Sequence, residues 1–356
     1  MRVRRFAAGG LLAGALLAVL PAAPAWAHDQ VPAASDYRTE LVAVTPQPRG
    51  VQVRVVENGS RIEVANRTGR DVTVLGYAGE PYLRITPEAV YANTRSPATA
   101  INDSKSKIKT LPTDARVEAK AAPSWKRIGD EPIARWHDHR SHWTGSGLPP
   151  AAEAEPGSPH RLRNWTVELV ADRTPVKVTG TLDYAPPPAT PVWWAGMLVA
   201  AAAVVLLGRW RRYGIRAIGA ALAVGAGAEL LDGVGRVLDS GATGLDVLAR
   251  LLTTETYGTL SALGALAAAV VALRRQPAAP FALALAGACL AVLGGVTDAA
   301  VFSQAFAPVP WSGEVARVCT AAAIAAGAGA TVAGWLRARA NLAVPGPAAE
   351  VSPVRG

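Results

Sequence analysis

The stretch that decides the membrane part of the fold is residues 192–208, which read VWWAGMLVAAAAVVLLG and are followed by RWRR at 209–212. This uncharged run is close to the ~20 residues that a helix needs to cross the hydrocarbon core of a bilayer. Arginines directly after an apolar span are typical of its cytoplasmic end. The pattern predicts a transmembrane helix that runs from the outside of the cell inward.

Four more apolar segments of similar length follow the first. Basic clusters come after the first, third and fifth segments, and the other two connections carry acids. This alternation predicts a multi-pass plasma-membrane protein whose C-terminus is cytoplasmic and whose first partner is the lipid bilayer. The segments are 192–208, 214–232, 251–273, 280–302 and 315–336; we expect a five-helix domain over 192–336 and a cytoplasmic tail over 337–356. The basic residues are Arg209, Arg211, Arg212, Arg274, Arg275, Arg337 and Arg339, and the acids are Asp239, Asp246 and Glu314.

The N-terminal residues 1–27 have the composition of a signal peptide. Three arginines precede an apolar stretch from Phe6 to Leu20, and Ala25-Trp26-Ala27 places small residues where a signal peptidase cleaves. An uncleaved membrane anchor is the alternative interpretation. Cleavage after Ala27 would make His28 the first residue of the mature chain, and residues 28–185 would then lie outside the cell.

Residues 28–185 predict an all-β domain of about seven strands, an immunoglobulin-like β-sandwich. Short Val- and Ile-rich runs alternate with polar residues, and Asn58-Gly59 is a strong hairpin signal. Residues 95–160 are expected to be irregular, and the proline-rich stretch 186–191 to be a stiff linker. The expected strands are Leu41–Thr45, Gln52–Val56, Arg61–Ala65, Val72–Leu75, Tyr82–Ile85, Asn164–Val170 and Val176–Tyr184.

The net charge of +9 raises the question of nucleic-acid binding. Residues 28–190 hold 21 Lys and Arg against 19 Asp and Glu, an excess of only two. The remaining positive charge sits in the first five residues and between the apolar segments, which fits membrane topology and not a basic binding face. Nucleic acid is therefore excluded as a partner. The only two cysteines, Cys289 and Cys319, lie in apolar segments, so no disulfide is expected in the exported domain.

The densest group of chemically active side chains is the stretch WHDHRSHW at residues 136–143. Three of the five histidines of the chain, His137, His139 and His142, fall within six residues here. Imidazole is the commonest protein ligand for zinc and copper, and residues two apart on an extended chain point to the same side. The pattern predicts a metal site with these three ligands. Around it, Asp138 and Arg140 are candidate orienting partners, and Trp136 and Trp143 would exclude water.

Two other interpretations of the same stretch remain open. The polar residues can form a hydrogen-bonded network that pins a long loop to the domain, or they can take part in catalysis without a metal. His28 is a possible fourth ligand, because an N-terminal histidine offers its amine and its ring nitrogen together, a set that suits Cu(II). Zinc is the alternative ion.

A second set of candidates lies within the apolar segments. Glu229 and Asp232 are three residues apart and so share a helix face, and Arg236 is four residues further on. Glu255 and Asp298 fall near the outer ends of the third and fourth segments. Ionisable side chains inside a membrane are functional candidates by default. Salt-bridged helix ends are the alternative explanation, and no segment carries the run of polar residues expected of a transport route.

The stretch GYAGEPYLRI at 76–85, with Tyr91, Asn93, Ser96-Pro97-Ala98 and residues 136–143, resembles a group of uncharacterised actinobacterial membrane proteins over roughly residues 40–190. That resemblance implies export and about five helices, and it supplies no activity. A more distant resemblance is to copper-resistance proteins of the C and D types, in which a small exported sandwich beginning with histidine accompanies a multi-helix membrane part. The departures are a mature chain with a single methionine, Met197, and helices without histidine. Any copper site would thus be nitrogen-rich and confined to the exported domain.

Together these features predict a non-enzymatic protein that handles or senses a metal ion, first of all copper, at the cell surface. The alternative is a cell-envelope scaffold whose sandwich binds a protein partner and whose histidines pin a loop. A copper-dependent oxidase is a third possibility, and it would need an open coordination position on the metal.

Overall fold

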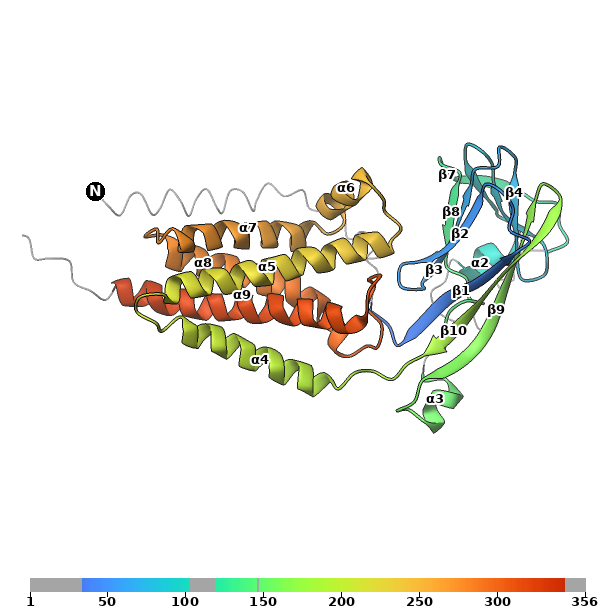
Figure 1. The fold of residues 1–356 in the computed structure, drawn as a ribbon. Coiled ribbons are helices and arrows are strands. Elements are labelled where there is room, and N and C mark those ends of the chain that lie inside the picture. The colour runs from blue at the N-terminus through green and yellow to red at the C-terminus, as the bar shows by residue number, and fades with distance from the viewer. Residues whose placement is uncertain (1–33, 103–118, 146, 343–356) are drawn as a thin grey trace, which may run out of the picture. The chain divides into compact units, whose positions relative to one another are not determined.

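The computed structural model describes residues 34–102, 119–145 and 147–342, which form two antiparallel sheets followed by long helices (Figure 1). The larger sheet has seven strands in the order β1-β10-β9-β4-β5-β6-β7, and the smaller has three in the order β2-β3-β8. The predicted signal peptide and His28 lie outside the described residues. The strands are β1 (Tyr37–Thr45), β2 (Val51–Val56), β3 (Arg61–Asn66), β4 (Val72–Leu75), β5 (Pro81–Ile85), β6 (Val90–Asn93), β7 (Trp125–Gly129), β8 (Ile133–Trp136), β9 (His160–Ala171) and β10 (Thr174–Tyr184).

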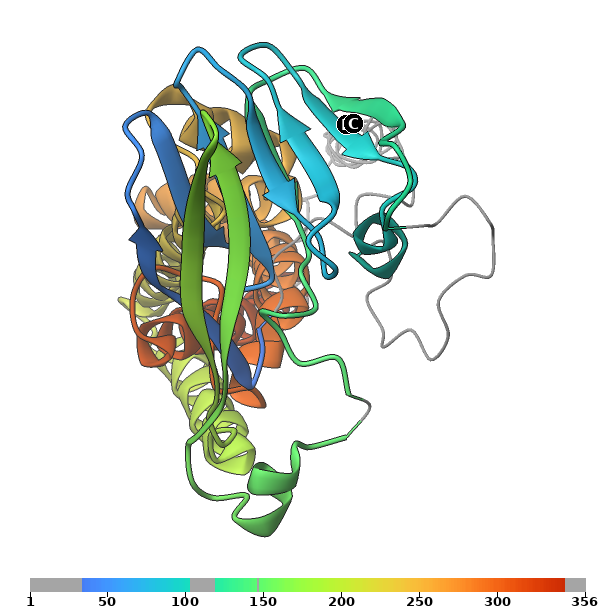
Figure 2. The same cartoon turned by 90° about the vertical axis from the view of Figure 1, so that its right-hand side faces the viewer.

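One hydrophobic core serves both sheets. Val64 of the small sheet belongs to the same buried cluster as Val74 and Leu169 of the large sheet. Burial alternates along the second half of β9, because successive side chains of a strand point to opposite faces. The two longest strands, β9 and β10, pair along nearly their whole length, with β1 on the other side of β10 (Figure 2).

The turn between β2 and β3 falls on the predicted Asn58-Gly59 pair. Glu57, Asn58 and Gly59 have φ values of 57°, 53° and 88°, a left-handed conformation that glycine and asparagine tolerate best. Val56 pairs with Arg61 across the turn, which closes the antiparallel ladder. The hairpin prediction is confirmed.

The sequence underestimates the strands of this domain. The described residues hold ten strands, where about seven were predicted, and the stretch 95–160 is not simply irregular. It contains β7 and β8 together with the short helices α2 (Pro97–Asn102) and α3 (Pro150–Ala154). β7 pairs with β6, and β8 pairs with β3. Both strands are only four or five residues long, so their pairing with distant partners decides their conformation and local alternation does not reveal it.

Five helical stretches are long and apolar enough to cross a membrane, as the five apolar segments predicted. The fourth stretch, Ala279–Phe302, changes its winding twice along its length, from α to π to 3₁₀. The last helix runs to Leu342, so the first residues of the predicted tail are helical. The elements are α4 (Thr190–Leu207), α5 (Gly214–Asp239), α7 (Thr256–Leu273), α8 (Ala279–Cys289), η2 (Leu290–Gly295), η3 (Val296–Phe302) and α9 (Gly313–Leu342).

The predicted third span began too early. Residues 245–253 form a separate helix, α6 (Leu245–Thr253), and the membrane-length helix starts only at Thr256. Leu245, Leu248 and Leu252 of α6 are exposed at helical spacing and so form one apolar face. The break falls at Glu255, whose backbone is not α-helical and whose side chain reaches a buried arginine described below.

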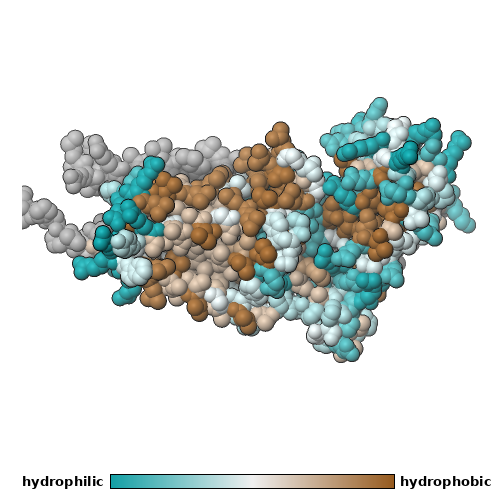
Figure 3. All heavy atoms as spheres, viewed as in Figure 1, coloured by the Kyte–Doolittle hydropathy of each residue, from teal (hydrophilic) through white to brown (hydrophobic). Residues whose placement is uncertain are grey.

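The visible surface of the helices is largely apolar, whereas that of the sheet domain is mixed, with hydrophilic residues around a smaller apolar area (Figure 3). Among the exposed large hydrophobic side chains in the described part of the chain, the sheet domain contributes only Val42, Ile128 and Leu148; the others lie between Val192 and Leu336. An apolar surface of this extent would aggregate in water and is expected of helices that face lipid. The helices therefore have the character of a multi-pass membrane protein.

Candidate functional site

The predicted metal stretch forms a loop directly after strand β8; residues 136–143 are called the histidine loop below. Trp136 ends β8 and pairs with Ile62 of β3, which brings the next residue, His137, beside Arg61. Arg61 Nε lies 3.2 Å from His137 Nε2 and 3.2 Å from Glu57 Oε2. The strand register thus places a guanidinium and a carboxylate at the first imidazole of the loop.

Asp138 is the structural centre of the histidine loop. Its side chain is completely buried, and both of its oxygens accept hydrogen bonds. Trp136 Nε1 donates to Oδ2 over 2.9 Å, and Arg140 donates through Nε to Oδ1 over 2.8 Å and through Nη2 to Oδ2 over 2.7 Å. Burial alone would raise the pKa of Asp138, but the hydrogen bonds and charge of Arg140 outweigh it and hold this pKa below its ordinary value.

The loop is docked on the segment that contains residues 75–80. The Arg140 guanidinium lies 4.7 Å from the centre of the Tyr77 ring, and the backbone N–H of His139 donates to Tyr77 Oη over 3.0 Å. Tyr77 in turn donates to Asn102 Oδ1 over 2.5 Å, and burial raises the pKa of this phenol. Residues 76–85 and 136–143 are the two stretches on which the sequence resemblance rested. They meet in the folded domain.

The rings of His137 and His139 both lie next to the ring of His142. The ring centres of His137 and His139 lie 5.9 and 5.4 Å from that of His142, and both pairs are edge to face. Nδ1 of His142 is buried and has no hydrogen-bond partner among the residues that the structure describes. Burial, and then the neighbouring His139 and His137, lower the pKa of His142 to about 4. Its ring is therefore neutral at pH 7.

His137 and His142 also line a pocket of about 280 Å³ on the sheet domain. Trp143 and Tyr37 form a stacked pair in its wall, with ring centres 6.3 Å apart, and Glu57 contributes a carboxylate. Within residues 34–102, 119–145 and 147–342, no three His, Cys, Asp or Glu side chains are grouped closely enough to hold a metal ion as they stand. The rings are neighbours, but they are not arranged as a finished coordination site.

Sequence reasoning missed the residues that hold the loop in place. Asp138 was predicted to orient an imidazole, whereas its two side-chain oxygens accept hydrogen bonds from Trp136 and Arg140. The partners Tyr77 and Arg61 were not recognised as site residues. Tyr77 could have been suspected from the sequence, because it lies in the stretch 76–85 that carries the resemblance. Arg61 could not, because its contact with His137 depends on the pairing of β3 with β8.

No protein-family model, curated protein or solved structure matches the chain. These comparisons carry no residue role over to it. The roles proposed below therefore rest on the geometry of the chain itself.

A second buried cluster lies among the helices, where four carboxylates surround one guanidinium. Arg236 lies 2.7 Å from Asp298 of η3, 2.9 Å from Asp232 and 3.1 Å from Glu255, with Glu229 at the 4.0 Å limit of an ion pair. The prediction that Glu229, Asp232 and Arg236 share a face of one helix is confirmed. The sequence did not predict that Glu255 and Asp298 would join them, since these residues come from other helices.

Small residues make room for this cluster. A Cβ atom at Gly258 of α7 would come within 2.4 Å of Glu229 Oε1, and one at Gly294 of η2 within 2.8 Å of Glu229 Cδ. The Glu229 carboxylate is therefore packed directly against two backbones. If all five groups are ionised, four negative charges face one positive charge, an excess of three. Charges are costly in such surroundings unless they are paired or hydrated.

Proposed function

We propose that the histidine loop binds a divalent metal ion, copper(II) in the first place and zinc as the alternative. The observation that carries this proposal is the buried Nδ1 of His142, which has no hydrogen-bond partner in the described part of the chain and belongs to a ring whose centre lies 5.9 and 5.4 Å from those of His137 and His139. A buried nitrogen without a hydrogen bond is costly, and a bound ion would remove that cost. In this proposal the protein handles or senses metal and is not an enzyme.

The donor set favours copper(II) or zinc over copper(I). Imidazole nitrogens suit both divalent ions, whereas copper(I) prefers thiolate and thioether sulfur. Met197 is the only methionine after residue 27, and it lies in α4. His28, at the N-terminus of the processed chain, would add an amine and a ring nitrogen as further donors.

Binding requires a local rearrangement of Arg61 and of the histidine loop. The Arg61 guanidinium lies beside His137 Nε2 and would repel a cation there. Arg61 also pairs with Glu57 and would have to rotate away from His137, and the three rings would have to move closer together than they stand here. His142 and His139 would bind first, and His137 would complete the set.

The setting of this site is part of the proposal. We place the sheet domain outside the plasma membrane, after removal of residues 1–27, with the C-terminus in the cytoplasm. The two sheets share one core and are taken as an immunoglobulin-like sandwich. The distribution of arginines between the membrane helices supports this orientation.

The alternative proposal is an envelope scaffold, in which the sheet domain binds a protein partner and the loop is only a structural element. The network of Asp138, Arg140 and Tyr77 favours it, because these groups hold the loop without an ion. The two proposals differ in what removal of the His142 ring does to metal binding.

The test is metal binding by the full-length protein in detergent, with Cu(II) titrated after removal of adventitious metal. We expect one ion per chain in the wild type. Loss of one ligand in His142→Ala should raise the dissociation constant for Cu(II) by at least about tenfold. The matched control is His160→Ala, because His160 is the remaining described histidine of the sheet domain and its ring contacts Glu155 O and Tyr184, away from the loop.

The outcomes separate the two proposals. A wild-type chain that binds less than one ion per five chains contradicts metal binding and leaves the scaffold. Equal affinity in His142→Ala and His160→Ala places the ion elsewhere. Nitrogen hyperfine lines in the Cu(II) electron paramagnetic resonance spectrum, lost in His142→Ala and kept in His160→Ala, would support the proposed ligands.

A further inference from the structure

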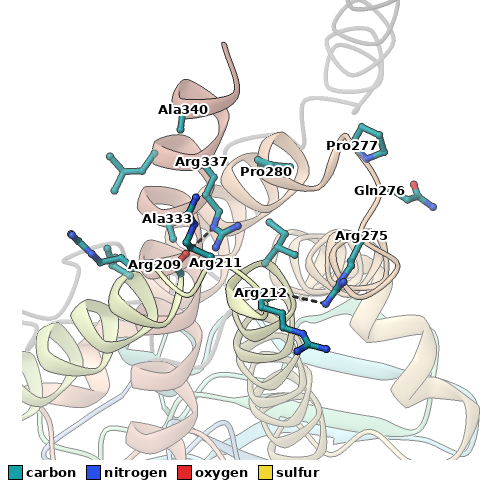
Figure 4. Close-up of a pocket in the computed structure, with 14 residues that line it drawn as sticks. Arg209, Arg211, Arg212, Arg275, Gln276, Pro277, Pro280, Ala333, Arg337 and Ala340 are labelled. Atoms are coloured by element: carbon teal, nitrogen blue, oxygen red, sulfur yellow. Dashed lines mark hydrogen bonds between the residues drawn. The ribbon is translucent and has the colours of Figure 1, made fainter. Parts of the chain in front are cut away.

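The membrane helices carry an arginine-lined pocket at the end opposite to their junction with the sheet domain. α4 follows the last strand at Thr190, and the pocket lies where α4 ends, between the α4–α5 turn, the α7–α8 turn and α9 (Figure 4). Its volume is about 890 Å³, within the range of roughly 300–1,000 Å³ that is usual for small-ligand sites. We call it the arginine pocket. Its basic side chains are Arg209, Arg211, Arg212, Arg275 and Arg337.

The polar wall of the arginine pocket carries only positive charge. No Asp or Glu is among its lining residues in the described chain. Arg209, Arg211, Arg212 and Arg275 are exposed, and Arg337 is half-buried. Arg140 and Arg236, described above, differ from them because each faces at least one carboxylate. Five guanidinium groups around one hollow create a positive potential, weakened by solvent and salt where the side chains are exposed, that would attract an anion.

Two of these arginines are held in place by backbone carbonyls. Arg337 donates from Nε to Gly208 O over 2.8 Å and from Nη2 to Trp210 O over 2.7 Å. Arg275, in the turn after α7, has a φ of 54° and donates from Nη2 to Arg212 O over 3.1 Å (Figure 4). These bonds tie the three segments together and use only part of each guanidinium's donor capacity, which is five N–H groups.

The remaining wall is apolar. Val205, Ile215 and Leu336 line the pocket together with Pro280 and Ala333. Leu336 is about half exposed, on a surface of helix that we assign to lipid. A hydrocarbon chain could therefore continue from the hollow along α9 without crossing a polar barrier.

We infer that the arginine pocket binds an anionic phospholipid, with the headgroup phosphate among the guanidinium groups and an acyl chain against Val205, Ile215 and Leu336. Guanidinium is the preferred partner of phosphate in proteins because its fork of donors matches two phosphate oxygens. Basic pockets between membrane helices are a recurrent form of lipid-headgroup site. Free phosphate would satisfy the arginines and leave the apolar wall without a function.

The binding experiment uses the full-length protein in a neutral detergent. Phosphatidylglycerol is added, and bound lipid is counted by native mass spectrometry, with phosphatidylcholine, glycerol phosphate and inorganic phosphate as parallel probes. We expect one phosphatidylglycerol to be retained at concentrations at which the other three are not. Retention of glycerol phosphate or inorganic phosphate as strongly as the lipid would overturn the lipid assignment.

The variant pair tests the location. Removing three lining charges in Arg211→Gln/Arg212→Gln/Arg275→Gln should weaken phosphatidylglycerol binding by at least about tenfold. The control Arg216→Gln/Arg274→Gln/Arg339→Gln removes three charges near the same end but outside the lining and should bind like the wild type. Equal losses in both variants would mean a general charge effect and contradict a site.

A thermal measurement on the wild type covers the case in which the lining variant does not fold. Phosphatidylglycerol should raise the melting temperature of the native chain, because a lipid bound in the pocket bridges three segments of the folded chain and does not bind the unfolded one. The same addition of phosphatidylcholine should leave it unchanged. Equal shifts with the two lipids would contradict the inference.

Discussion

The sheet domain and the membrane helices bury charge in opposite ways. In the sheet domain, Asp138 faces the single guanidinium of Arg140, and its remaining acceptor capacity is used by Trp136 and by backbone N–H. Among the helices, Arg236 faces four carboxylates. The first arrangement is balanced in charge and completely hydrogen-bonded. The second has an excess of acid, and its Asp232 Oδ1 and Arg236 Nε have no partner among the residues described.

The comparison indicates different roles for the two clusters. A balanced pair with full hydrogen bonding fixes a conformation, and here it fixes the loop on which the three imidazoles stand. An unbalanced cluster depends on its one cation, because removal of that cation leaves several acids in a site from which water is largely excluded. For the same reason, we expect the unbalanced cluster to tolerate the loss of one acid better than the loss of its only base.

The largest effect is expected for Arg236→Met. Breaking a buried ion pair by removing one partner costs about 3–5 kcal/mol, and here one substitution leaves four carboxylates without their cation. We expect little folded protein in detergent extracts, measured by the monodisperse fraction in size-exclusion chromatography. Arg250→Met is the control, since Arg250 pairs with a half-exposed Asp246 over 2.8 Å. Normal yield of Arg236→Met would contradict the dependence on a single cation.

A matched pair of substitutions sharpens the comparison. Asp138→Asn removes the charge from the balanced pair and should destabilise the histidine loop by about 3 kcal/mol, seen as faster hydrogen exchange of residues 137–142. Asp298→Asn removes one of four acids from the cluster around Arg236, and we expect its melting temperature to stay within a few degrees of the wild type. Equal losses in the two variants would show that charge balance does not distinguish the clusters.

The last of these predictions concerns the pH dependence of stability. The pKa of His142 is lowered from 6.5 to about 4, so between these values the unfolded chain takes up a proton that the folded chain does not. Stability from this group is therefore present at neutral pH and falls as the pH is lowered from 6.5 to 4, by at most about 3 kcal/mol. The metal-free protein should show this loss in its melting temperature, and His142→Phe should reduce it. An unchanged pH dependence in His142→Phe would contradict the assignment.

The sequence predicted the membrane-length helices and one hairpin, which depend on residues close together in the chain. The five apolar segments and the Asn58-Gly59 hairpin could be found because span length, loop charge and turn residues act within a few residues. β7 and β8 could not, because each is stabilised by a strand distant in sequence.

The same distinction holds for the two sites. The proximity of His137, His139 and His142 was predicted from their spacing. The bonds to Arg61 and Tyr77 depend on which strands pair and which loops meet. Glu255 and Asp298 were identified as membrane acids, but their convergence on Arg236 required the packing of three helices.

The π-helical turn η2 in the fourth membrane stretch affects the direction in which Asp298 points. An α-helix turns about 100° per residue, and a π-helical segment such as η2 accommodates one residue more per turn than the α-helical ladder. If the same residues continued as a regular α-helix through η2, every residue after Gly295 would be rotated by about that angle from its present direction. Asp298 would then swing off the axis that leads to Arg236 while the length of the span hardly changed. The extra residue in η2 thus determines the direction in which the Asp298 carboxylate points, and so its contact with Arg236.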